Sequence, residues 1–354
     1  MSYQRQRASR LQRRQQLARR RLAALFGLAL AIALVIAVAM SGGGKTSSKK
    51  HGQAGTAAGR PARSTQTPLD VSSIEVSGSL PASVQDPAVA LTPSGALLLI
   101  GGLDQAETSV ADILRVSATG ASRIGTLPGA LHDASASFVA GAAYLFGGGQ
   151  LTSVSQITRI DPASGSTQPA GNLPTPASDV ASTVVNGTVY IVGGYTGAEP
   201  LRTILAWRPG GAAHLVATLP KPLRYAAVAA IGTQVLIAGG TSGEVASSEV
   251  YRLDTQSGAL TTIAHLPSPL THAAAVAVGQ SMLVLGGRVS PSSGQTRSIL
   301  AITPAGSVRT VGMLPTGLSD MAAALLGSRV ILAGGRDQNG RVRDQIMTLG
   351  LTGG

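Results

Sequence analysis

A pattern of 46 to 48 residues occurs six times in this chain, and it limits the folds that the chain can adopt. Each copy opens with a Leu-Pro pair and carries a double glycine 20 or 21 residues later. The pairs begin at Leu80, Leu127, Leu173, Leu219, Leu266 and Leu314, and the double glycines begin at Gly101, Gly147, Gly193, Gly239, Gly286 and Gly334. A fixed period of this length indicates a repeat architecture in which each copy forms one supersecondary unit.

Each copy has the pattern of four short antiparallel strands. In the third copy, residues 180–185 and 188–192 flank an Asn186-Gly187 pair, which is typical of a tight hairpin turn. A third strand, a glycine-containing turn and a fourth strand follow before the next Leu-Pro pair. The first strands are rich in alanine, as in AAVAAI at 226–231, but six residues between turn glycines are too few for a helix. Four strands per copy, with the smallest side chains on the first, predict a β-propeller blade.

The two ends of the repeat array complement each other. After the last double glycine one strand-like segment remains, at 344–351, and an unpartnered segment at 72–78 precedes the first Leu-Pro pair. If this amino-terminal segment is the fourth strand of the last blade, the ring closes without a free edge between its ends. The sequence therefore predicts an all-β, six-bladed propeller over residues 71–354.

The repeat resembles the kelch family of β-propellers. The resemblance rests on the six double glycines, on Tyr144 and Tyr190 three positions before their glycines, and on Leu-Pro-Lys-Pro-Leu-Arg at 219–224. It covers residues 71–354 and implies the propeller fold. The fourth-strand tryptophan of the family is missing from every copy, and the single tryptophan, Trp207, falls in a third strand. The resemblance therefore leaves the functional subfamily open.

The excess of positive charge lies outside the repeats. Residues 1–70 hold 13 Lys and Arg residues and one acidic residue, whereas residues 71–354 hold 15 of each sign. A propeller without net charge has no long-range attraction for a polyanion, so we expect no nucleic-acid partner.

The amino-terminal segment has the pattern of a membrane anchor. An arginine-rich tail at 1–21 precedes 19 uncharged, largely apolar residues at 22–40, and a Gly/Ser/Lys-rich linker occupies 41–70. Nineteen helical residues are close to the thickness of one bilayer core, and the flanking arginines favour a cytoplasmic amino terminus. We expect one transmembrane helix at the cell membrane with the propeller outside. A cleaved signal peptide is the alternative, and it also exports the propeller.

A polar side chain stands six positions after the leucine of each Leu-Pro pair, where each inner strand begins. These residues are Asp86, Asp133, Asp179, Tyr225, His272 and Asp320, with His132 and Arg224 adjacent to members of the set. In a propeller they surround the axis on one face, and we call them the channel-mouth ring. One interpretation is a site for a cation such as Ca²⁺, an amine or a polyhydroxylated ligand. The other is that each aspartate caps its own turn.

The loops between second and third strands emerge on the same face and vary in length and chemistry. Their candidate binding residues, the loop face, are Asp104, Tyr195, Glu244, Arg288, Arg336 and Asp337. Variable loops on a constant scaffold are typical of binding surfaces.

Catalytic signatures are weak. The absence of cysteine excludes disulfides, thiol catalysis and cysteine-ligated metals, and no HExxH or GxSxG motif occurs. We therefore predict no catalytic residue and no resident cofactor. The favoured hypothesis is a membrane-tethered binding or scaffolding module for an envelope protein or carbohydrate. Two alternatives are a structural spacer and a sugar mutarotase of the kelch type, implied by the resemblance, with Asp133, His132 or His272 in acid–base roles.

Overall fold

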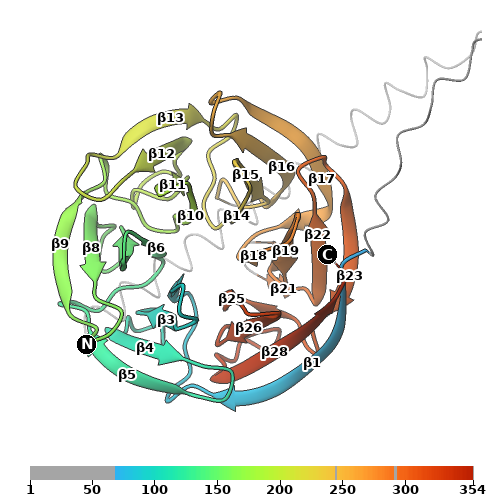
Figure 1. Ribbon diagram of the computed structural model, residues 1–354, viewed down its shortest axis with the longest axis horizontal. Coiled ribbons are helices and arrows are strands. Elements are labelled where there is room, and N and C mark those ends of the chain that lie inside the picture. Colours follow the sequence, from blue (N-terminus) through green and yellow to red (C-terminus); the bar gives the residue numbers. More distant parts are fainter. Residues whose placement is uncertain (1–67, 244, 291–292, 354) are drawn as a thin grey trace, which may run out of the picture. The chain divides into compact units, whose positions relative to one another are not determined.

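The computed structural model describes residues 68–243, 245–290 and 293–353. These residues form six four-stranded antiparallel sheets around a central axis, so the predicted six-bladed propeller is confirmed (Figure 1). The predicted tail, membrane helix and nearly all of the linker lie outside the described residues. Within the described part of the chain, no helix has the length and hydropathy needed to cross a bilayer.

The strands follow one another outward from the axis in each blade. Blade 1 contains β2 (Ala88–Leu91), β3 (Leu97–Ile100), β4 (Asp112–Val116) and β5 (Ala121–Thr126), and blade 2 contains β6 (Ser135–Val139), β7 (Ala142–Phe146), β8 (Gln156–Ile160) and β9 (Thr167–Asn172). Blade 3 contains β10 (Ala181–Val185), β11 (Thr188–Val192), β12 (Thr203–Trp207) and β13 (His214–Thr218), and blade 4 contains β14 (Ala227–Ile231), β15 (Gln234–Ala238), β16 (Ser247–Asp254) and β17 (Leu260–Leu270). Blade 5 contains β18 (Ala274–Val278), β19 (Ser281–Leu285), β22 (Ser298–Ile302) and β23 (Val308–Met313).

Blade 6 joins the two ends of the propeller. It contains β25 (Ala322–Leu326), β26 (Arg329–Ala333), β28 (Gln345–Thr352) and, outermost, β1 (Asp70–Ser79). The antiparallel pairing of β1 with β28 confirms the predicted closure, although β1 begins at Asp70, one residue before the predicted boundary. Asp70 of β1 forms an ion pair with Arg309 of β23 in blade 5 (2.8 Å), and Glu75 forms one with Arg329 of β26 (3.4 Å) on the far side of β28.

The side chains change in character from the axis outward. The inner strands β2, β6, β10, β14, β18 and β25 each contact the next around the ring, and small residues such as Ala90, Ala229 and Ala324 are buried there. The second strands β7 and β11 are buried at every position because neighbouring blades cover both of their faces. The fourth strands, such as β5 and β9, are largely exposed. Crowding at the axis therefore overrides the helical propensity of alanine.

The double glycines join each blade to the next. In all six copies the N–H of the second glycine donates to a carbonyl oxygen in the connection to the following blade, at 2.8 Å, as from Gly194 to Leu223. The first glycines have φ between +57° and +68°. A Cβ at any first glycine would lie 2.0–2.3 Å from the same carbonyl oxygen. The backbones of neighbouring blades therefore approach each other too closely at these glycines for any side chain.

Trp207 occupies β12, the third strand of blade 3, as predicted. Its ring is buried against Tyr144 and Phe146 of β7 in blade 2, with ring centroids 4.9 and 5.3 Å away. The only tryptophan of the chain therefore fills the interface between two blades.

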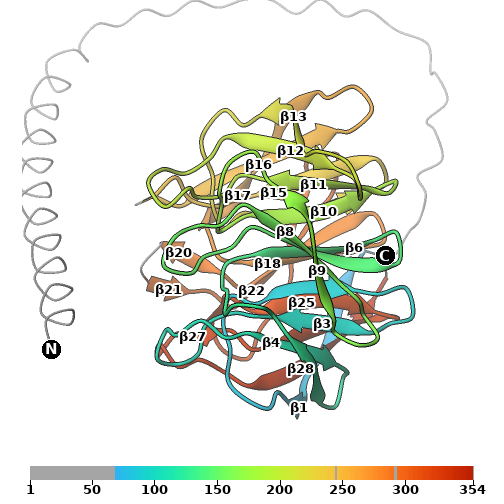
Figure 2. The same cartoon turned by 90° about the vertical axis from the view of Figure 1, so that its left-hand side faces the viewer.

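Short pairings extend the sheets on one face. The strands β20 (Arg288–Ser290) and β21 (Ser293–Gln295) form a hairpin, and β24 (Leu318–Ser319) pairs with β27 (Arg336–Asp337). Figure 2 shows β20, β21 and β27 projecting on the same side of the propeller. Arg288, Arg336 and Asp337 of the loop face lie on these strands.

Candidate functional site

The six residues of the channel-mouth ring share one backbone conformation. Each lies just before an inner strand and has φ between +51° and +61°, in the left-handed region. The N–H of each ring residue donates to the carbonyl oxygen of the ring residue in the preceding blade, at 2.7–3.4 Å, and the N–H of Asp86 donates to Asp320. The six hydrogen bonds thus form a closed cycle around the axis.

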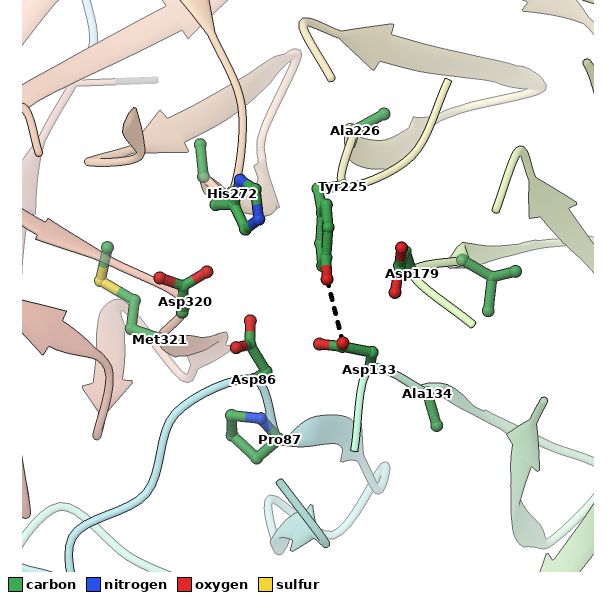
Figure 3. Close-up of a pocket in the computed structure, with 12 residues that line it drawn as sticks. Asp86, Pro87, Asp133, Ala134, Asp179, Tyr225, Ala226, His272, Asp320 and Met321 are labelled. Carbon is green, nitrogen blue, oxygen red and sulfur yellow. Dashed lines mark hydrogen bonds between the residues drawn. The ribbon is translucent and has the colours of Figure 1, made fainter. Parts of the chain in front are cut away.

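The side chains of the ring converge on one axial cavity of about 140 Å³ (Figure 3). The residue after each ring position also lines it, which adds an apolar tier of Pro87, Ala134, Val180, Ala226, Ala273 and Met321. The cavity, which we call the axial pocket, therefore combines ionisable groups with small apolar walls and has room for roughly five to ten water-sized groups.

The ring carboxyls do not cap their own turns. Asp104, Asp161, Asp254 and Asp337 each accept backbone N–H groups from their own loops. Among the described residues, no backbone N–H donates to a ring carboxyl. Turn capping therefore accounts for Asp104 and Asp337 of the loop face, whereas the ring aspartates point into the axial pocket (Figure 3).

Two of the four ring carboxyls form ion pairs with arginines. Arg224 forms an ion pair with Asp179, and its guanidinium carbon lies 4.2 Å from the ring centroid of Tyr195 and 4.9 Å from that of Tyr225. Arg288 forms an ion pair with Asp320. Arg288, which was predicted as a loop-face residue, thus also contacts the ring.

Ser319 is a further residue of this site that the sequence did not predict. It accepts a hydrogen bond from Arg288 Nε (3.0 Å) and donates one to Asp320. The sequence does contain a pattern that could have identified it, because the residue before every ring position is polar. These residues are Gln85, His132, Ser178, Arg224, Thr271 and Ser319. Each of these residues pairs through its backbone with the residue after a double glycine, so the six copies place them alike.

The other two carboxyls have no guanidinium partner. Burial, with the nearby carboxyls of Asp320 and Asp133, raises the pKa of Asp86 well above its usual range. Burial and the neighbouring Asp179 likewise raise the pKa of Asp133, although the hydroxyl of Tyr225 donates to its Oδ2 at 2.9 Å. Both carboxyls therefore keep their protons to a higher pH than an exposed aspartate does.

The arginine-paired carboxyls are better able to hold a charge. Burial raises the pKa of Asp179, and Arg224 acts against this shift. For Asp320, burial also acts to raise the pKa, but the charges of His272 and Arg288 outweigh it and the pKa is lowered. Burial lowers the pKa of His272 itself to about 4, so at pH 7 Arg288 is the positive charge that keeps Asp320 ionised.

Tyr225 and His272 form one wall of the pocket. Their rings stack with centroids 3.7 Å apart and an interplanar angle of 24°. Burial raises the pKa of Tyr225 well above its usual range, so both side chains are neutral at pH 7. Asp133 Oδ1, His272 Nδ1 and Asp320 Oδ1 are buried without a hydrogen-bond partner among the described residues.

The remaining predicted residues surround this centre. His132 Nδ1 lies 2.8 Å from Ser109 Oγ, and its Nε2 lies 3.8 Å from Asp133 Oδ2. Arg336 donates to Gln85 and to Glu107, and buried Asp337 forms an ion pair with Arg343. Glu244 lies outside the described residues.

The pocket does not have the arrangement of a metal centre. Throughout the described ranges, no three His, Asp or Glu side chains are grouped so that they could hold a metal ion. Calcium takes six to eight oxygen ligands at 2.3–2.6 Å, whereas two of the four ring carboxyls are bound to guanidinium groups. The geometry therefore does not favour the interpretation of the ring as a calcium site.

These features define a six-bladed β-propeller with a polar pocket on its axis. Comparisons with known proteins agree with this class: the Kelch motif matches residues 176–210 and 222–259, within blades 3 and 4 and the loops before them. A solved structure described as "Structure of YjhT" is similar, with a TM-score of 0.67 and 14% sequence identity over 79% of this chain and 99% of that chain. No curated protein matches the sequence. The chain is thus an all-β, six-bladed propeller, and two of its blades match the Kelch motif.

Proposed function

We propose that this chain is a membrane-tethered, extracytoplasmic propeller that binds a ligand in the axial pocket and acts as a binding or scaffolding module. Its partner is an envelope protein or carbohydrate, and the pocket binds without catalysing a reaction. The observation that carries the proposal is the backbone conformation of the channel-mouth ring.

The ring keeps polar side chains where glycine would be less strained. A non-glycine residue in the left-handed region costs roughly 1–2 kcal/mol, less for Asp and His and more for a bulky residue such as Tyr225. Burying carboxyls against one another adds a further cost, which the two arginines offset only in part. Strain and buried charge are concentrated at one cavity, and such concentration is typical of ligand sites.

The tether and the partner class rest on the sequence. The charge asymmetry around 22–40 favours export of everything that follows, whether that segment is an anchor or a signal peptide. The loops around the pocket mouth differ between blades, and they carry exposed or half-buried groups such as Tyr195 and Arg336. These groups suit a partner in the cell envelope.

Affinity capture from detergent-solubilised envelope tests the proposal. We expect the full-length chain to recover a stoichiometric protein or carbohydrate, and the Asp133→Asn/Asp179→Asn variant to lose it. Asp161→Asn is the matched control, because Asp161 caps a turn between β8 and β9 remote from the pocket. Equal recovery by the pocket variant and the control would reject the pocket as the binding site. A reporter fused after residue 70 that is active only in the cytoplasm would reject the localisation.

A sugar mutarotase is the second candidate. One observation favours it: a carboxyl with a raised pKa, Asp133, and an imidazole with a lowered pKa, His272, line the same cavity. Opposite shifts of this kind suit an acid and a base. Exchange between sugar anomers, followed by NMR with and without the chain, tests this candidate. Acceleration that is lost in His272→Gln would support it, and an unchanged exchange rate would exclude it for the sugars used.

A further inference from the structure

The charges around the axial pocket do not balance when every group takes its ordinary form. The groups that face the pocket or contact its lining are Asp86, Asp133, Asp179, Asp320, Tyr225, His132, His272, Arg224 and Arg288. Both histidines have lowered pKa values because of burial, and the tyrosine is neutral. Four carboxylates against two guanidinium groups would leave two negative charges inside the protein.

The geometry identifies which two charges are uncompensated. Arg224 is bound to Asp179, and Arg288 is bound to Asp320. No lysine or arginine forms an ion pair with Asp86 or Asp133 among the described residues. An isolated buried carboxylate is costly, so burial favours the protonated form of both groups while the pocket is empty.

The pocket offers mainly acceptors when Asp86 and Asp133 are ionised. The hydroxyl of Tyr225 already donates to Asp133, and both guanidinium groups bind carboxylates. Asp133 Oδ1 and Asp320 Oδ1 are buried carboxyl oxygens without a hydrogen-bond partner among the described residues, and Arg224 Nε is a buried donor without one. Once Asp86 and Asp133 lose their protons, acceptors and negative charge are in excess, and a ligand that carries N–H donors and positive charge complements them. The apolar tier of the pocket can cover a short hydrocarbon segment beside that charged group.

We propose, building on the ligand-binding function above, that the axial pocket recognises primary ammonium groups and binds them in exchange for the protons of Asp86 and Asp133. The exchange conserves the charge of the pocket, because one carboxyl proton passes to solvent for each ammonium group that is bound. A diammonium ion replaces both protons and leaves the pocket neutral. The ammonium can belong to a free aliphatic amine or to an amino sugar of the envelope.

Titration calorimetry of the full-length chain with matched pairs of probes tests this proposal. The first pair is 1,4-diaminobutane and the neutral 1,4-butanediol; the second is glucosamine and glucose. We expect the amine of at least the first pair to bind and its neutral counterpart not to. Binding of glucosamine over glucose would place the ammonium on a sugar. A neutral probe that binds as tightly as its amine would overturn the proposal.

Proton release provides a second measurement. Binding enthalpies in two buffers of different ionisation enthalpy give the number of protons released, and we expect about two per diamine. The affinity then rises by up to about 100-fold per pH unit while both carboxyls are protonated in the empty pocket. Diamine binding without proton release would contradict the exchange.

An isosteric variant connects the exchange to the pocket. Asp133→Asn should lower proton release to about one per diamine and weaken binding at least tenfold, whereas Asp161→Asn should leave both unchanged. The near-ultraviolet circular dichroism spectrum verifies that each variant is folded. Binding of a neutral probe that Asp133→Asn abolishes would reject the ammonium inference and preserve the ligand-binding function. Absence of binding by both amines would also reject the inference, while the ligand-binding function is judged by the capture experiment.

Discussion

Replacing Gly193 with alanine tests how the blades are joined. Gly193 has a φ of +61°, and a Cβ there would lie 2.1 Å from the carbonyl oxygen of Leu223. The left-handed conformation alone costs alanine about 1–2 kcal/mol. The clash also displaces the carbonyl that accepts a hydrogen bond from Gly194, and an unsatisfied buried group costs a further 1–3 kcal/mol or so. We therefore expect the free energy of unfolding to fall by about 2–5 kcal/mol.

Gly187→Ala is the matched control in the same blade. Gly187 has a φ of +74°, and no atom lies within 4 Å of the position of its Cβ. Only the conformational cost applies, so we expect a loss of about 1–2 kcal/mol. Urea unfolding, followed by the fluorescence of the buried single tryptophan Trp207, measures both variants. If Gly193→Ala is no more destabilising than Gly187→Ala, the proposed contact between blades does not constrain the fold.

Three further predictions follow from the closure and from the pocket. Deletion of residues 70–79 should strongly lower the unfolding midpoint because it exposes the edge of β28, and an unchanged midpoint would refute the closure. In NMR titrations His272 should protonate near pH 4, so its contribution to stability grows as pH rises from about 4 to 6.5; a pKa near 6.5 would contradict its burial. Because folding raises the pKa of Asp133, its contribution is present at low pH and is lost as pH rises through the folded pKa. Asp133→Asn should therefore flatten the loss of stability on the alkaline side, and a denaturation series from pH 4 to 9 that matches wild type would count against the shift.

The repeat made the fold predictable, because a nearly constant period places equivalent residues at equivalent positions of each blade. The blade number, the pairing of β1 with β28, the third-strand position of Trp207 and the convergence of Asp86 with Asp320 all follow from spacing alone. No such rule distinguishes an aspartate that caps a turn from one that faces a pocket.

Asp104 and Asp133 illustrate this limit. Both stand at a break in a strand pattern, yet Asp104 accepts two backbone N–H groups of its own loop, while Asp133 has a φ of +54° and points into the axial pocket. The difference depends on backbone angles that a single sequence does not specify. The ion pair between Arg288 and Asp320 was also not predicted, because the length of a loop does not determine which group a long side chain contacts.

The closure of the ring by β1 has a mechanical consequence. Every residue before Asp70 is attached through that strand, so tension applied from the amino-terminal side acts first on the seam between β1 and β28. The seam begins at the pair of Asp70 with Thr352, near the other end of the chain. A pull strong enough to peel β1 away would free the outer edge of blade 6 while the other five blades remain complete. The strand that completes the circle is thus also the one that bears the load.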